Sequence, residues 1–229
     1  MMYFDPMYFL IVGPGMLLAL WASIKVKTTF NKYAKVPISR GRSGADVARE
    51  LLQKAGVHDV GVEVHQGWLS DHYHPGKKMV RLSPDVFHGH SISAVGVAAH
   101  EAGHAIQHAK GYFLMSLRQA LVGPANMGST FSYIAIIAGV LLQAANLIWV
   151  GILLFCGVVA FQLVTFPVEW NASSRAKKHL LEYAVVTEGE SKGVRKVLNA
   201  AAMTYLAALI TSVLTLLYFV LRFTGVGRD

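Results

Sequence analysis

The sequence predicts an α-helical integral membrane protein with four transmembrane helices and a small α+β domain outside the membrane. Hydrophobic residues make up 54% of the 229-residue chain, and the mean hydropathy is +0.43, which is high for a water-soluble domain. Four apolar stretches contain no Asp, Glu, Lys, Arg or His. The remaining chain alternates helical and strand patterns around a histidine motif, which indicates a separate folded domain.

Each apolar stretch is long enough to span a bilayer, which takes roughly 20 residues. The stretches run approximately over residues 7–24, 125–143, 147–166 and 201–221. A chain of this length cannot bury four such helices in a water-soluble core. The first stretch lacks the basic start and the small-residue cleavage site of a signal peptide, so we expect a retained anchor.

Basic residues predict the orientation, because loops rich in Lys and Arg stay in the cytoplasm. They cluster after the first span and between the third and fourth, whereas Asp5 is the only charge before the first. Arg222 and Arg228 near the C-terminus weaken the asymmetry slightly. The predicted organisation is an anchor at 1–25, a cytoplasmic domain at 26–124, two transmembrane helices at 125–166, a cytoplasmic segment at 167–200 and a last transmembrane helix at 201–229.

The net charge of +8 does not require nucleic acid as a partner. Much of the charge lies next to the spans and is expected to face anionic lipid, and no nucleic-acid-binding motif is present. All ten histidines lie outside the spans, which argues against a membrane cytochrome. The uncharged spans likewise argue against a transporter of metals or small solutes.

The segment before the histidine motif reads as a helix followed by a hairpin. Residues 43–55 have helical apolar spacing, 60–65 and 77–82 alternate as strands, and 71–76 resemble a turn between them. Ser83 followed by Pro84 predicts a capped helix start. The strand from Val60 to Ser70 could bind an extended peptide by strand addition.

The sequence His100-Glu101-Ala102-Gly103-His104 predicts a catalytic zinc site. Histidines four residues apart lie on one face of a helix and can bind one Zn²⁺, and Glu101 can take a proton from a zinc-bound water. An apolar helix from Val95 to Ile106 surrounds the motif, so an ionised Glu101 there would need a partner. Gly103 predicts that another backbone passes close to this helix.

His108 continues the four-residue spacing but is excluded as a third ligand. A rise of about 1.5 Å per residue puts its Cα roughly 12 Å from that of His100, too far for one tetrahedral zinc on a straight helix. Glu169 is the better candidate, because it follows the third span on the cytoplasmic side with the histidines. Three other carboxylates share its loop and are expected to be solvated: Glu182, Glu188 and Glu190.

Several segments together resemble one family, the YugP-like neutral zinc metallopeptidases of bacterial membranes. They are residues 70–73 (SDHY), 80–83 (VRLS), 98–107 (AAHEAGHAIQ), 167–173 (PVEWNAS) and 196–201 (KVLNAA). The resemblance covers nearly the whole chain. It implies a zincin-like zinc peptidase domain with one Zn²⁺ on His100, His104 and Glu169, and with Glu101 as general base.

The resemblance also implies a multi-pass protein of the bacterial inner membrane that hydrolyses peptide bonds of protein or peptide substrates. The orientation predicted from the basic residues puts this reaction at the cytoplasmic face. Related membrane proteases of the HtpX and CAAX-processing kind carry E-x-x-x-D after the third span, with the Asp supporting the first histidine. Ser173 occupies the Asp position here, so Asn171 or Ser173 is expected to support the histidines.

Two questions stay open from the sequence. Arg175 and Tyr205 are candidates to stabilise the oxyanion, although lipid or packing contacts are the favoured explanation for both residues. The alternative function is a non-catalytic four-span scaffold or chaperone-like protein with a structural zinc, which would need a fourth protein ligand.

Overall fold

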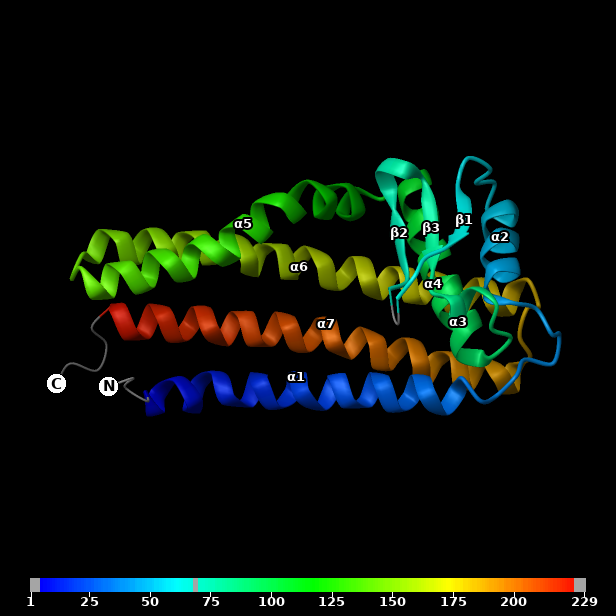
Figure 1. Ribbon diagram of the computed structural model, residues 1–229, viewed down its shortest axis with the longest axis horizontal. Helices are drawn as coiled ribbons and strands as arrows, with labels where there is room; N and C mark the ends of the chain where they lie inside the picture. Colours follow the sequence, from blue (N-terminus) through cyan, green and yellow to red (C-terminus); the bar gives the residue numbers. More distant parts are fainter. Residues whose placement is uncertain (1–4, 68–69, 225–229) are drawn as a thin grey trace. The chain divides into compact units, whose positions relative to one another are not determined.

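The structure is a computed structural model that describes residues 5–67 and 70–224 (Figure 1). Over these residues it is mostly helical and contains one three-stranded sheet. The elements follow in the order α1 (Pro6–Tyr33), α2 (Gly44–Lys54), β1 (Gly61–Val64), β2 (His72–His74), the 3-10 helix η1 (Pro75–Lys77), β3 (Met79–Leu82), α3 (Pro84–Phe87), α4 (Ile92–Ala109), α5 (Phe113–Leu141), α6 (Ala145–Glu182) and α7 (Glu188–Phe223).

The chain divides into two compact units. The apolar unit comprises residues up to Ala22, Leu117–Pro167 and the residues from Thr204 onward. The α+β unit comprises Ser23–Ser116 and Val168–Met203, and it therefore combines two segments that the sequence separates by about fifty residues. Each unit is described on its own below.

Among the described residues, four helices are long and apolar enough to cross a membrane, which confirms the predicted number: α1, α5, α6 and α7. All four run past the apolar stretches seen in the sequence, and α6 continues through polar residues to Glu182. Glu169 therefore lies on a regular helix and not on the predicted loop.

The apolar unit has a small core and an apolar surface. Its buried cluster contains Ile136, Ile152, Phe155, Val159 and Phe219. Large side chains point outward from the same helices, and Leu10, Leu141 and Leu153 are each more than 70% exposed. Such a surface would aggregate in water, and it is the surface expected of helices in contact with lipid.

In the α+β unit, α2 begins and ends as the sequence predicts. Ser43 caps the helix by accepting from the Asp46 amide, and Asp46 accepts from Ser43 in return. This capping box satisfies amides that have no partner within the helix. One face of α2 is buried against the unit's core, including Val47, Leu51 and Leu52.

The sheet corrects the predicted hairpin. β1 and β3 pair in parallel, with Val62 opposite Val80, and β2 pairs with β3 in the antiparallel direction. The strand order is β1-β3-β2, so β3 lies in the middle (Figure 1). The sequence 71–76 was expected to be a turn, but His72–His74 is a strand whose central Tyr73 is buried.

The turn of the true hairpin lies between β2 and β3. It consists of η1, which begins at Pro75, and of Lys78, whose φ of 48° is in the left-handed region. A turn was predicted over 71–76 because this range is polar and contains Pro75 and Gly76. Only its second half forms the turn. Trp68 and Leu69, within the strand expected from Val60 to Ser70, lie outside the described residues, and β1 ends at Val64.

Ser83 occupies the predicted N-cap position before Pro84, but its hydroxyl does not cap α3. The Ser83 amide and hydroxyl donate instead to the carboxylate of Asp71, with the amide at 2.8 Å. This pair fixes the start of β2 to the end of β3. Burial raises the pKa of Asp71 above its ordinary value, and the bonds from Ser83 only partly offset that effect.

Helix α4 forms the centre of the α+β unit. Ser91 caps it by accepting from the Ala94 amide, and the helix is buried over most of its length. Residues of α2, β3 and α6 surround it in one apolar cluster, among them Leu51, Leu82 and Val168. The histidine motif is thus held on a rigid, buried helix.

Candidate metal centre

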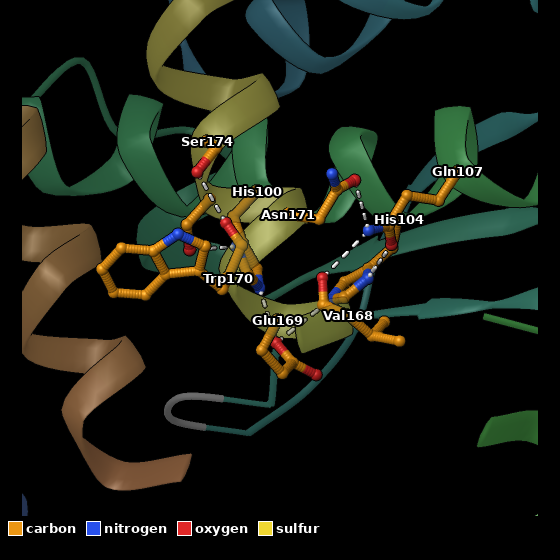
Figure 2. Close-up of polar contacts among 9 residues, drawn as sticks. His100, His104, Gln107, Val168, Glu169, Trp170, Asn171 and Ser174 are labelled. Carbon is orange, nitrogen blue, oxygen red and sulfur yellow. Dashed lines mark hydrogen bonds and ion pairs between the residues drawn. The ribbon is translucent and has the colours of Figure 1, made fainter. Parts of the chain in front are cut away.

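His100 and His104 lie one turn apart on α4 and point toward the same carboxylate. Nε2 of His100 is 3.1 Å from Oε2 of Glu169, and Nε2 of His104 is 3.2 Å from the same oxygen. The two imidazole rings are 4.6 Å apart and nearly perpendicular. Figure 2 shows both rings turned to Glu169 from the neighbouring helix.

Glu169 reaches the histidines because α6 packs closely against α4. Its side chain is only 2% exposed. Val168, Ala172 and Ala176 are fully buried on this part of α6. A Cβ on Gly103 would lie 2.9 Å from the carbonyl oxygen of Ala172, so only glycine permits this approach. The close backbone predicted from Gly103 is therefore that of α6.

These three side chains fit a zinc ion. Their ligand atoms all lie within 4.8 Å of one another. Ligands in a tetrahedral zinc site lie roughly 3.3–3.4 Å apart, as follows from Zn–N and Zn–O bonds near 2.0–2.1 Å. The distances of 3.1 and 3.2 Å are close to that value. Two neutral imidazoles and one carboxylate are also a donor set that zinc peptidases use.

Gln107 orients His104, and the sequence reasoning missed it. Its side-chain oxygen lies 3.0 Å from Nδ1 of His104. Its amide nitrogen donates to the backbone oxygen of Val168 at 2.9 Å and to Oδ1 of Asn171 at 3.0 Å (Figure 2). The side-chain nitrogen of Gln107 donates both of these bonds, so its oxygen is the atom that faces His104. That oxygen must accept from Nδ1–H of His104, and Nε2 of His104 is then unprotonated and can bind a metal.

Ser173 orients His100 in the same way. Its Oγ lies 3.1 Å from Nδ1 of His100. A hydroxyl can accept from Nδ1–H, so both histidines can present unprotonated Nε2 atoms. Of the two residues expected to support the histidines, Ser173 contacts one directly, whereas Asn171 acts through Gln107.

Glu101 lies beside the ligands and is not one of the three clustered donors. Its side chain is 8% exposed, and burial raises its pKa to about 7, opposed by His100 and reinforced by the charges of Glu169 and Asp71. A carboxyl group next to a metal site whose pKa is near 7 is suited to accept and donate a proton at neutral pH.

Other candidates from the sequence lie apart from the three ligands. Glu182 pairs with His179 at 3.4 Å, and Glu190 accepts from the amides of Thr187 and Ser39. Glu188 is exposed in the first turn of α7. None of the three belongs to the candidate metal group within the described part of the chain.

Arg175 and Tyr205, the two candidates to stabilise the oxyanion, belong to different units of the chain. Arg175 donates to Oδ1 of Asn171 at 2.7 Å, so it supports the amide network behind His104. Tyr205 belongs to the apolar unit and not to the unit that holds the histidines.

Comparison with known proteins shows the family of this chain. The family described as "Putative neutral zinc metallopeptidase" matches residues 8–224. The chain belongs to this family. It is 48% identical over 212 residues to "Putative membrane protease YugP" of Bacillus subtilis (strain 168), covering 93% of this chain and 94% of the relative. No solved structure matches the chain.

Membership confirms the family that the sequence segments resemble, and with it zinc as the cofactor. The three residues that could hold the ion are His100, His104 and Glu169. When bound, zinc supplies a Lewis acid that lowers the pKa of a water molecule and polarises a carbonyl group.

Proposed function

We propose that this protein is a zinc-dependent metalloendopeptidase of the bacterial inner membrane that hydrolyses peptide bonds at the cytoplasmic face. The observation that carries the proposal is the meeting of His100, His104 and Glu169 with Glu101 directly beside them. The family and the printed name of the B. subtilis relative support peptidase chemistry in general. The site is proposed to belong to a zincin-like domain.

Each side chain has a role in this proposal. The imidazoles of His100 and His104 and the carboxylate of Glu169 hold the metal, while Ser173 and Gln107 keep both rings in the binding tautomer. Glu101 takes a proton from the attacking water and passes it to the leaving amine. Its burial and its raised pKa favour such a transfer, because the protonated and ionised forms are then close in energy near neutral pH.

The substrate is proposed to bind as an added strand along β2. β2 lies at one edge of the sheet and packs against α4, the helix that carries Glu101. β1, the strand first expected to bind peptide, lies at the opposite edge. Peptide backbone at an exposed edge gains main-chain hydrogen bonds, so recognition would depend weakly on side chains.

The structural-zinc alternative predicts a closed site with four protein ligands. The candidate group contains three protein donors within the part of the chain that the structure describes. Three ligands leave one position for water, as in catalytic sites. The donor number therefore favours the peptidase proposal over a structural zinc.

The test is Glu101→Gln in the full-length protein in detergent. Zinc content by mass spectrometry and cleavage of fluorescein-labelled casein are measured against wild type. We expect one zinc per chain in both proteins and a loss of cleavage of roughly 10²–10⁴-fold in the variant, the usual contribution of a general base. Equal cleavage rates would show that Glu101 is not the base, and a casein-inactive wild type would favour the scaffold alternative.

The proposed cytoplasmic location is tested separately. His58 is exposed in the α+β unit, so His58→Cys in a Cys156→Ser background gives one accessible thiol. A membrane-impermeant maleimide should label it in inverted inner-membrane vesicles and not in intact spheroplasts. Labelling of intact spheroplasts would place the unit on the outer side.

A further inference from the structure

Trp170 and Lys177 form a cation–π pair on the part of α6 that extends beyond its apolar stretch. Nζ of Lys177 lies 5.5 Å from the centre of the Trp170 ring, and Trp170 is 49% exposed. The two residues are seven positions apart, so they lie two turns apart on nearly the same face. Side chains of a helix lean toward its N-terminus, which for Lys177 is the direction of the apolar stretch. The Lys177 charge is therefore held closer to that stretch than its own Cα is.

Asn199 of α7 joins this pair. Nζ of Lys177 donates to Oδ1 of Asn199 at 3.1 Å. Asn199 comes just before the apolar stretch of α7, and Trp170 comes shortly after that of α6. At a rise of about 1.5 Å per residue, they lie roughly 3 and 6 Å from the ends of these stretches. The three residues therefore lie where two apolar helices become polar.

A second cation lies one turn from Asn199. Arg195 is four residues earlier on α7, so it shares a face with Asn199, and both are exposed. In the described part of the chain, the side-chain partners of Lys177 are Trp170 and Asn199, and neither is an acid. Arg195 has no ion pair among the same described residues. Two cations thus lie close together without a counter-charge from the protein.

A phosphate group with apolar tails fits this arrangement. Lys and Arg bind phosphate through charge-assisted hydrogen bonds. Trp side chains favour the level of the lipid headgroups, because the ring is apolar and its N–H is polar. The apolar stretches of α6 and α7 begin next to these residues, so acyl chains can lie along the helices while the phosphate contacts the cations. A free phosphate ion would use the cations and leave the exposed indole without a partner in the ligand.

We propose that these side chains bind the headgroup of an anionic phospholipid, in what is called the headgroup site below: Trp170, Lys177, Arg195 and Asn199. The site differs from a diffuse basic surface because two helices supply its cations at a fixed spacing. It goes beyond the proposed peptidase function, since it requires a membrane but neither the metal nor Glu101.

The test compares two double variants of the full-length protein that lose the same charge. Lys177→Gln with Arg195→Gln removes both cations of the headgroup site. Lys178→Gln with Lys196→Gln is the control, because these exposed lysines are the next residues on the same two helices. Each protein in detergent is titrated with phosphatidylglycerol, which is anionic, and with phosphatidylcholine, which has no net charge. Native mass spectrometry counts the bound lipids.

A basic residue at an anionic lipid surface contributes roughly fivefold in affinity. We therefore expect Lys177→Gln with Arg195→Gln to weaken phosphatidylglycerol binding by roughly 30-fold, and the control to weaken it by less than about fivefold. Wild type should prefer phosphatidylglycerol to phosphatidylcholine. Equal losses in the two double variants would indicate a diffuse basic surface and overturn the site. Equal binding of the two lipids by wild type would overturn it as well.

Two further measurements keep the result unambiguous. Arg195→Gln alone changes one exposed side chain, so it serves if the double variant does not fold; a roughly fivefold loss is expected, and unchanged affinity would contradict the proposal. Inorganic phosphate at millimolar concentration is added as competitor. It should leave phosphatidylglycerol bound, and displacement would mean that the residues bind free phosphate and not lipid.

Zinc content and cleavage separate this inference from the proposed function. The substitutions leave the three candidate metal ligands in place, so both double variants should bind zinc like wild type. If Glu101→Gln cleaves normally while the site variant alone loses lipid, the base assignment fails and the headgroup site stands. If Glu101→Gln loses cleavage while all variants bind lipid alike, the headgroup site fails and the peptidase proposal stands.

Discussion

The side-chain oxygen of Gln107 lies 3.0 Å from Nδ1 of His104, one turn earlier on the same helix. The bond selects the tautomer that binds metal through Nε2. Gln107→Leu keeps the volume and removes the acceptor. We expect zinc affinity to fall roughly 10–100-fold, the range seen when residues that orient a metal ligand are lost. Chelator competition measures this, with Gln53→Leu on α2 as an exposed control. Equal affinities would mean that Gln107 serves packing only.

Glu169 should matter more for zinc than any other carboxylate of its segment. Glu169→Gln preserves shape and removes the charge that faces both imidazoles. We expect a loss of zinc affinity larger than that of Gln107→Leu, because a ligand itself is weakened. Glu182→Gln is the matched control, since Glu182 is exposed on the same helix and pairs with His179. If both variants bound zinc like wild type, the third ligand would have to be sought elsewhere.

Two glycines of α4 should respond in opposite directions to alanine. Replacing a helix-interior glycine by alanine normally stabilises by up to about 1 kcal/mol. At Gly96 a Cβ would meet Val194 at 3.7 Å, an ordinary contact, so Gly96→Ala should be neutral or stabilising. At Gly103 it would meet the Ala172 carbonyl at 2.9 Å, so α4 and α6 must separate.

We therefore expect Gly103→Ala to lower the unfolding temperature and the zinc content together. Overpacking of this kind costs about 1–3 kcal/mol. Thermal unfolding in detergent and metal analysis of both variants decide the question. A Gly103→Ala protein as stable and as zinc-rich as Gly96→Ala would contradict the close packing of the two helices.

Asp71→Asn should change how stability depends on pH. Burial raises the pKa of Asp71, so the folded protein binds its proton more tightly than the unfolded chain does. Wild type therefore loses stability as pH rises above the ordinary value of 3.8 toward the raised one. Asn keeps an acceptor for the Ser83 amide and has no such loss.

The gain of Asp71→Asn over wild type should accordingly be larger at pH 7 than at pH 4. Asp59→Asn should have the opposite effect and destabilise the protein more at pH 7 than at pH 4. The reason is that the hydrogen bond from Lys78 lowers the pKa of Asp59 and stabilises its charged form. Unfolding temperatures of both variants across this range give the result. Parallel curves for Asp71→Asn and wild type would show that Asp71 titrates as it does in the unfolded chain.

Much of the site was predictable because its geometry is local to helices. Residues four apart on a helix must share a face, so His100 and His104 had to be neighbours. Glu169 required a further step, the expectation that two distant segments lie on one side of the membrane. Gln107 could also have been found, since it lies one turn after His104 in an apolar run where a buried amide needs partners.

The sheet was harder to predict because strand pairing depends on long-range contacts. Residues 71–76 contain Asp, Pro and Gly, which are typical of turns. The burial of Tyr73 against α4 nevertheless favours an extended strand in the first half of the segment. β2 occupies one side of β3, and β1 pairs in the parallel direction on the other side. No local pattern in 60–82 specifies that order.

The contact between Gly103 and Ala172 has a consequence for how the metal is acquired. Backbone packing there, and the bond from Gln107 to the Val168 carbonyl, join α4 to α6 through protein atoms alone. The ligands are consequently preorganised, and ion binding does not have to assemble them. Stripping the protein with a chelator should leave it folded and ready to be reloaded, so metal supply could switch its activity on and off without new synthesis.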